Sequence, residues 1–128
     1  MEFAKTVSES DIYLFAGITG DFSPNHVNAE YMKDTPYGTI IAHGALIVGL
    51  MSTCSTRVLD YASSGRPVVS YGYDRIRFVK PVRVGDTVTV TYEIVAEEPV
   101  EAKTTAEVTA TNQRGEIVAV ATHILKFL

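Results

Sequence analysis

The segment from Gly44 to about Ala62 limits most strongly what this chain can fold into. Its first half is apolar on every face, and no turn signal interrupts it. A run of this length favours a helix over a strand, and a helix that is apolar all round must be enclosed by other structure. Polar groups enter only late, at Arg57 and Asp60, and the Ser-Ser-Gly-Arg-Pro cluster at 63–67 is expected to stop the helix.

Four strand-like segments follow, at residues 68–79, 86–96, 102–111 and 116–127. In the second of them, Tyr92 and Ile94 continue an apolar series that alternates with threonines and Glu93, as in a strand with one buried face. Residues 112–115 are expected to form a hairpin loop in which Gly115 adopts a positive φ. Because the helical segments come first and the strands afterwards, the sequence predicts an α+β fold. A curved antiparallel sheet is expected to wrap around the long helix.

Shorter elements are expected before the long helix. Ser8 is placed to cap a first helix, and Asp11 three residues later resembles a capping box. Gly17 and Gly20 weaken this helix and are expected to end it. Residues 28–33 are compatible with a short helical piece, and residues 35–38 with a turn.

Composition is consistent with one domain, residues 1–128, that has its own core. Hydrophobic residues make up 46% and charged residues 20% of the 128 residues, which argues against disorder. The net charge of −4 argues against a general nucleic-acid binder, and the apolar stretch 45–51 is too short to cross a bilayer. The single cysteine, Cys54, and the absence of a basic, apolar leader predict a reducing, cytoplasmic location.

Asp21 and His26 lie five residues apart in an expected loop, with Pro24 between them. A carboxylate can accept a proton from water, while an imidazole orients the water or shares the proton. Spacing alone nevertheless favours ordinary turn and surface roles for these two residues, because such pairs are common in loops.

A second candidate site lies where Ala42-His43-Gly44 enters the long helix. The first backbone N–H groups of a helix have no intrahelical partner, so they can stabilise an oxygen that becomes negative. Gly44 allows a ligand to approach closely, although it can also be merely a tight junction, and His43 is interpreted as structural. Ser52, about two turns further on, can bond a ligand or catalytic side chain, or the carbonyl of residue 48.

Three segments together resemble the MaoC-like dehydratase family, which includes the (R)-specific enoyl-CoA hydratases. Residues 15–26, Phe-Ala-Gly-Ile-Thr-Gly-Asp-Phe-Ser-Pro-Asn-His, are similar to the family pattern Gly-Asp-x-Asn-Pro-x-His. Residues 37–44 resemble its Phe-Gly…Ile-Ala-His-Gly segment, and residues 77–86 its strand and turn after the long helix. One departure is Ser23, which stands where the family usually has asparagine. Serine makes a similar turn hydrogen bond with a shorter reach, so the fine geometry of the loop and the substrate range are expected to differ, while both proposed catalytic residues stay in place.

The resemblance implies a hot-dog fold and a hydro-lyase of fatty acid metabolism. Its reaction is hydration of trans-2-enoyl-CoA to (R)-3-hydroxyacyl-CoA, or the reverse dehydration. By position, Asp21 and His26 match the pair that holds the reacting water. Gly44 matches the glycine whose N–H binds the thioester oxygen, and Ser52 matches a supporting serine.

The same resemblance implies binding partners and leaves several alternative functions open. An acyl-CoA substrate and a homodimer or dimer-based oligomer are expected, with no cofactor, nucleic acid or membrane. No metal is expected, because the three histidines are widely spaced and Cys54 has no cysteine partner. Arg75, Arg77, Lys80 and Arg83 can meet the CoA phosphates or form only a solvated strand face. A hot-dog acyl-CoA thioesterase, a non-catalytic acyl-CoA binding module and a subunit that needs a second chain remain the alternatives.

Overall fold

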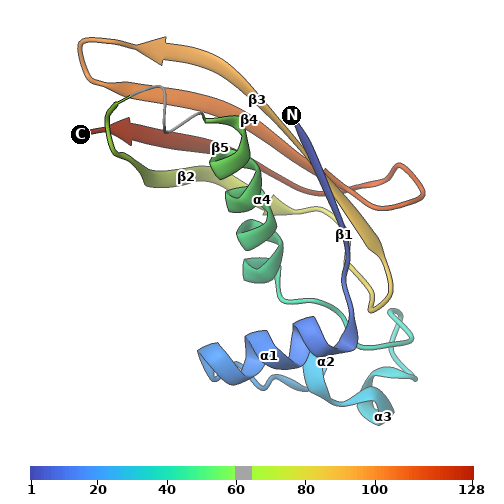
Figure 1. The fold of residues 1–128 in the computed structure, drawn as a ribbon. Helices are drawn as coiled ribbons and strands as arrows, with labels where there is room; N and C mark the ends of the chain where they lie inside the picture. The colour runs from blue at the N-terminus through green and yellow to red at the C-terminus, as the bar shows by residue number, and fades with distance from the viewer. Residues whose placement is uncertain (60–64) are drawn as a thin grey trace.

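The computed structural model describes residues 1–59 and 65–128. Its helices are α1 (Glu9–Thr19), α2 (Pro24–Val27), α3 (Ala29–Met32) and α4 (Gly44–Val58). Its strands are β1 (Glu2–Thr6), β2 (Val68–Phe78), β3 (Thr87–Glu98), β4 (Lys103–Thr111) and β5 (Ile117–Phe127). All strands join one antiparallel sheet in the order β1-β3-β4-β5-β2. Figure 1 shows the sheet curving past α4, with α1, α2 and α3 gathered where α4 begins, which confirms the expected architecture.

The core lies between α4 and the concave face of the sheet. Ile47, Met51 and Cys54 recur at helical spacing and are buried, and Val88 and Val90 of β3 are buried as well. Each fully buried side chain of this size contributes about 1.5–3 kcal/mol. The alternation expected for residues 87–94 therefore reflects one face packed on the helix.

The helix α4 differs from its prediction in two ways. Ala45, Gly49 and Ser52 are exposed, because the sheet of this chain covers only one side of the helix. The expectation of a helix enclosed on every face is therefore wrong for this chain by itself. The helix also ends at Val58, since Leu59 has extended backbone angles (φ −88°, ψ 124°). The expected end near Ala62 and the first two residues of the stop signal, 63 and 64, lie outside the described residues.

The N-terminal region contains a strand that the sequence did not predict. β1 pairs with β3, so that Phe3 lies opposite Val90. Most β1 side chains are exposed, which leaves no clear alternation to recognise. Pairing with a distant strand decides its conformation. α2 was likewise expected to be loop, although Pro24 at its first position suits a helix start.

The ends of α1 follow the capping rules. Ser8 accepts a hydrogen bond from the Asp11 backbone N–H, and the Asp11 side chain accepts one from the Ser8 backbone N–H. Gly20 ends the helix with φ 82°, and its N–H donates to the Ala16 carbonyl. Gly17 lies within the helix, so the expectation that it helps to end α1 is wrong. The turn at 35–38 and the short helix near 29–32 are confirmed.

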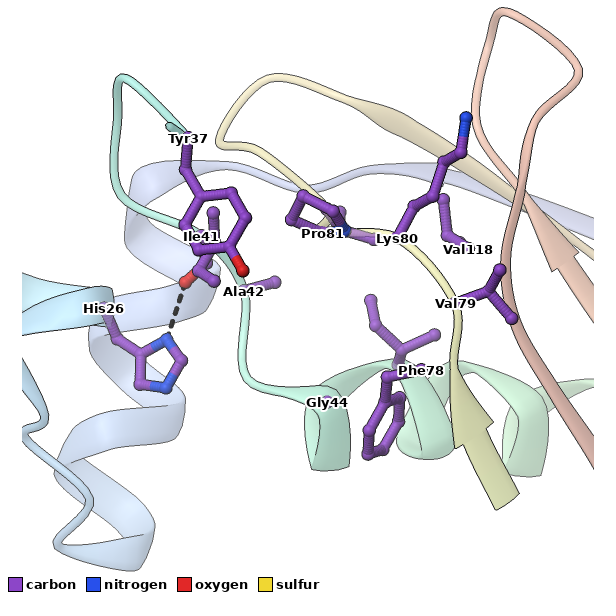
Figure 2. Close-up of a pocket in the computed structure, with 12 residues that line it drawn as sticks. His26, Tyr37, Ile41, Ala42, Gly44, Phe78, Val79, Lys80, Pro81 and Val118 are labelled. Atoms are coloured by element: carbon purple, nitrogen blue, oxygen red, sulfur yellow. Dashed lines mark hydrogen bonds between the residues drawn. The ribbon is translucent and has the colours of Figure 1, made fainter. Parts of the chain in front are cut away.

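A bulge in β2 controls where its last side chains point. Pairing between β2 and β5 shifts register between Asp74 and Arg77, and Arg75 has a positive φ of 53°. Bulges of this kind bend a strand and redirect its side chains. Phe78 is 56% exposed as a result, and its ring lies at the start of α4 (Figure 2).

His123 of β5 is completely buried in a polar cluster on the sheet. Its Nδ1 lies 2.8 Å from the Tyr92 hydroxyl, and its Nε2 lies 2.8 Å from the Ser70 hydroxyl. The Tyr73 ring stacks on the imidazole with 4.0 Å between ring centroids. Burial lowers the pKa of His123 to about 4.

Acidification is therefore expected to weaken the fold through His123. The unfolded chain binds a proton near the ordinary histidine pKa of about 6.5, whereas the folded chain resists it until about pH 4. Stability present above pH 6.5 is lost as the pH falls from 7 to 5, by about 1 kcal/mol after allowance for screening. Urea unfolding of wild type and His123→Gln at both pH values measures the loss. Equal losses in the two proteins would contradict this expectation.

Within residues 1–59 and 65–128, none of the helices has both the length and the apolar character needed to cross a membrane.

Candidate active site

The end of α1 and the start of α2 position Asp21 and His26. Asp21 follows Gly20, and its Oδ1 accepts a hydrogen bond of 3.3 Å from the Ser23 backbone N–H. The His26 backbone N–H donates to the Ser23 carbonyl at 2.9 Å. The Ser23 hydroxyl makes no capping hydrogen bond to α2. Residue 23 thus fixes the turn through its backbone, so serine in place of the family asparagine preserves the approach of the two candidate residues.

The tautomer of His26 follows from a hydrogen bond to the backbone. Its Nδ1 lies 2.7 Å from the Ile41 carbonyl oxygen, drawn as a dashed line in Figure 2. A carbonyl oxygen can only accept, so Nδ1 must carry the hydrogen. In the neutral ring Nε2 is then an acceptor, and it can bind a water O–H.

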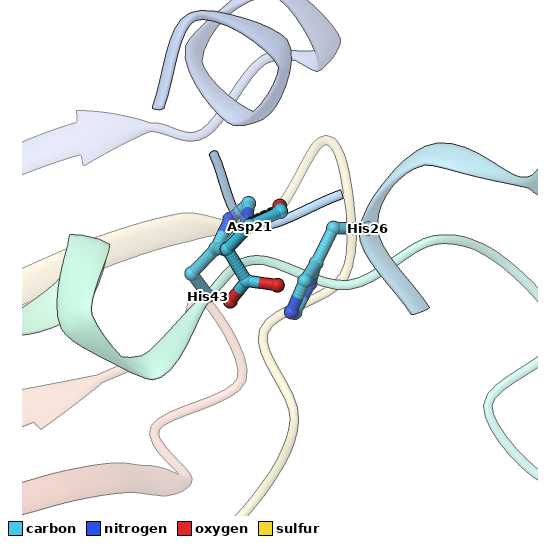
Figure 3. Close-up of side chains that lie close together, drawn as sticks. All are labelled: Asp21, His26 and His43. Atoms are coloured by element: carbon cyan, nitrogen blue, oxygen red, sulfur yellow. Dashed lines mark hydrogen bonds between the residues drawn. The ribbon is translucent and has the colours of Figure 1, made fainter. Parts of the chain in front are cut away.

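His43 contacts both candidate residues (Figure 3). Its ring stacks on the His26 ring with 3.7 Å between centroids and 23° between planes. Its Nε2 lies 3.0 Å from the Asp21 backbone carbonyl oxygen. His43 is 2% exposed, and its side chain forms no capping hydrogen bond to α4. His43 therefore occupies the N-cap position of α4 without a side-chain cap, and its side chain is packed, in agreement with its interpretation as structural.

The fold brings together histidines that are distant in the sequence. Asp21, His26 and His43 each offer a potential metal-ligand atom, and these atoms all lie within 4.8 Å of one another. An imidazole lone pair lies in the plane of its ring, and the two ring planes are stacked and nearly parallel. The two lone pairs therefore do not converge on one ion, and the arrangement favours acid–base chemistry over metal binding.

Gly44 opens α4 beside a cavity of about 260 Å³. His26, Gly44, Phe78 and Lys80 are among the lining residues, and Figure 2 shows the Phe78 ring beside the first turn of α4. A Cβ atom on Gly44 would come within 2.5 Å of that ring. Among the described residues, no backbone carbonyl accepts a hydrogen bond from the Gly44 N–H. This donor is therefore available to a ligand in the cavity that His26 also lines.

Ser52 lies away from this group of residues. It is exposed on α4 and faces Tyr73, whose pKa is raised by burial and lowered by the nearby Ser52 side chain. No hydrogen bond of normal geometry joins the two hydroxyl groups, and the buried Tyr73 hydroxyl has no partner among the residues that the structure describes. The described hydrogen bonds join Ser52 Oγ neither to a catalytic side chain nor to residue 48. Its proposed contact with a ligand stays a prediction.

The four basic residues of residues 75–83 differ in their contacts. Arg75 donates to the Thr122 hydroxyl, and Arg77 donates to the Ile76 carbonyl. Lys80 pairs with Glu116 and, together with Arg114 and Asn112, lowers the pKa of that carboxyl to about 2. Of the four, only Lys80 lines the same cavity as Gly44. A role in phosphate binding is therefore most direct for Lys80.

Comparison with solved structures defines the class of fold. The R-hydratase PhaJ1 from Pseudomonas aeruginosa, in its unliganded form, superimposes with a TM-score of 0.87 at 28% sequence identity. The alignment covers 99% of this chain and 78% of that one. A "Monoamine oxidase regulatory protein" from Archaeoglobus fulgidus superimposes with a TM-score of 0.81 at 31% sequence identity. That alignment covers 99% of this chain and 87% of the other. The expected hot-dog fold is confirmed.

The family follows from the sequence comparisons. A family model described as a MaoC-like domain matches residues 1–116, and the chain belongs to this family. It is 44% identical to an "(R)-specific enoyl-CoA hydratase" of Rhodospirillum rubrum over 108 residues, which are 84% of this chain and 72% of that one. It is 41% identical over 90 residues to a "3-hydroxybutyryl-CoA dehydratase" of Methylorubrum extorquens, covering 70% of this chain and 54% of the relative. The expected hydro-lyase chemistry agrees with both names.

Proposed function

We propose that this protein catalyses the hydration of trans-2-enoyl-CoA to (R)-3-hydroxyacyl-CoA, and the reverse dehydration. The observation that carries the proposal is the close approach of Asp21 to His26, whose Nε2 is free to accept. Gly44 supplies an available N–H at the cavity that His26 lines. The (R) hand and the CoA carrier are taken from the names of the relatives.

Water orientation follows from the hydrogen-bonding character of the two side chains. The Asp21 carboxylate and His26 Nε2 are both acceptors, so one water molecule between them donates one hydrogen to each. The oxygen lone pair then faces away from the pair, towards C3 of the bound enoyl group. A base held in this way contributes roughly 10²–10⁴-fold to the rate.

The proposed reaction conserves atoms and charge. Water oxygen bonds to C3 as Asp21 takes its proton, and the C2=C3 electrons move to the thioester oxygen as an enolate. The Gly44 N–H, at the positive end of α4, donates to that oxygen. The enolate collapses as C2 takes a proton from the Asp21/His26 pair, which returns to its starting state. Dehydration runs the same steps in reverse.

The domain organisation, location and substrate of the enzyme are part of the same proposal. We infer that residues 1–128 act as one cytoplasmic domain, with the acyl-CoA as substrate and without a further cofactor or metal. Ser52 is proposed to support the ligand from α4, on a face that this chain leaves exposed. The (R)-hydratase reaction belongs to fatty acid metabolism.

A homodimer is proposed from the edge of the sheet. β2 is an edge strand, and it leaves Val69, Tyr71 and Phe78 exposed. Unpaired strand edges are usually covered in native proteins, and two-fold dimers are the commonest oligomers. Light scattering should give twice the chain mass of 14.0 kDa; the mass of a single chain would contradict the dimer.

The proposed reaction is tested with crotonyl-CoA and the purified protein. We expect the enoyl absorbance to fall without release of free thiol, and chiral analysis to give the (R) product. Thiol release at the rate of substrate loss would instead indicate a thioesterase. Absence of any reaction across a series of chain lengths would favour a non-catalytic binding module or a subunit that requires a second chain.

A further inference from the structure

We infer that His43 is a positioning residue that fixes the positions of Asp21 and His26 relative to each other and to Gly44. This inference rests on the proposed function, because it concerns the same site. His43 contributes no group to the reacting water in this account. Its role is to fix the two residues that do.

The first contact concerns Asp21. His43 Nε2 lies 3.0 Å from the Asp21 backbone carbonyl oxygen, which can only accept, so Nε2 donates. The Asp21 carboxylate itself is exposed, and among the described hydrogen bonds it accepts one, of 3.3 Å, from the Ser23 N–H. The bond from His43 is therefore the contact that ties the Asp21 backbone to the start of α4.

The second contact concerns His26. The Ile41 carbonyl fixes one edge of its ring at Nδ1, but a single hydrogen bond leaves the ring free to swing about that point. His43 lies flat against the same ring, at 3.7 Å between centroids. Phe15 of α1 supports His43 in turn, with ring centroids 4.7 Å apart. The stack thus limits the direction in which His26 Nε2 can point.

The hydrogen bonds of the His43 ring indicate which ring nitrogen carries the hydrogen that this role needs. His43 Nδ1 is buried and has no hydrogen-bond partner within residues 1–59 and 65–128. A proton at Nδ1 would create a buried donor without an acceptor, which is costly. A hydrogen at Nε2 avoids this cost and makes the bond to the Asp21 carbonyl. Because His43 directly precedes Gly44, the same residue links all three proposed catalytic groups.

Two substitutions separate the hydrogen bond from the stack. His43→Phe keeps a flat ring beside His26 and removes the donor to Asp21. His43→Gln places an amide N–H near the position of Nε2 and removes the ring. Misplacement of a reacting group by about 1 Å can cost 100-fold in rate. We therefore expect His43→Phe to lower kcat for crotonyl-CoA by about 10- to 100-fold, with little change in KM and in the thermal midpoint, and His43→Gln to regain part of the loss.

A double-mutant cycle with Asp21→Asn distinguishes positioning from a general structural effect. If His43 acts through Asp21, His43→Phe has little further effect on kcat once the carboxylate is gone, because residues that act as a unit are non-additive. Losses that multiply, or a loss confined to KM, would overturn the inference. Failure of the proposed function is distinguishable, because then the wild type does not hydrate crotonyl-CoA or Asp21→Asn is as active as the wild type.

Discussion

Replacing Asp21 by asparagine is expected to lower kcat for hydration of crotonyl-CoA by about 10²- to 10⁴-fold, the usual contribution of a general base. The amide preserves the size of the side chain and an oxygen that can still accept the Ser23 N–H bond. It cannot take a proton from water. Because the carboxylate is exposed, its loss should leave the fold intact. Steady-state kinetics at saturating substrate measures the effect.

Asp34 provides the matched control for this substitution. It is an exposed aspartate in the turn before Gly38 and lines none of the described cavities. Asp34→Asn therefore makes the same change of charge away from the site and should retain wild-type kcat. Equal kcat values for Asp21→Asn and wild type would show that Asp21 is not the base.

Removing the Gly44 N–H is expected to lower kcat by about 10²- to 10³-fold, as for other single donors to a developing oxyanion. Gly44→Pro removes this N–H and leaves the helix able to form, because proline suits the first helical position. His43 already has the extended backbone that a residue before proline requires, with φ −60° and ψ 136°. The Phe78 ring would meet the new Cβ at 2.5 Å, so the substitution is made together with Phe78→Ala.

The matched control is Gly44→Ala combined with Phe78→Ala. It adds the same Cβ and removes the same ring, but it keeps the backbone N–H. Comparison of kcat between the two double variants therefore isolates the hydrogen bond from the steric change. We expect the alanine pair to be at least tenfold more active than the proline pair. Similar kcat values in the two would contradict the assignment of Gly44 as the thioester donor.

The sequence predicted the elements whose signals are local. Ser8 and Asp11 form the capping box, and Val88 and Val90 alternate as a half-buried strand should. β1 was missed because its exposed side chains leave no alternation to detect. Its strand conformation comes from pairing with β3, which lies far along the chain. The enclosure of α4 was overestimated because small residues such as Ala45 and Gly49 do not show whether a helix face is covered.

The site was predictable only in part, for a similar reason. Asp21, His26 and Gly44 were named from motifs, and the fold brings the first two together and places His26 and Gly44 on one cavity. The contacts of His43 were missed because they depend on how α1, α2 and α4 meet. Its place in the Ala42-His43-Gly44 run was the one signal available, since a histidine at a helix start can reach neighbouring loops. The buried cluster around His123 has no local sequence signal, because Ser70 and Tyr73 come from β2 and Tyr92 from β3, whereas His123 lies on β5.

The most direct test of the central claim is the fate of water oxygen. Crotonyl-CoA is incubated with the enzyme in ¹⁸O-labelled water, and the products are analysed by mass spectrometry. The proposed mechanism predicts that the label enters the 3-hydroxyl group of an intact CoA thioester, at a rate that Asp21→Asn reduces strongly. Label in the carboxylate of a free acid, with release of CoA, would contradict hydration and would assign the site to thioester hydrolysis.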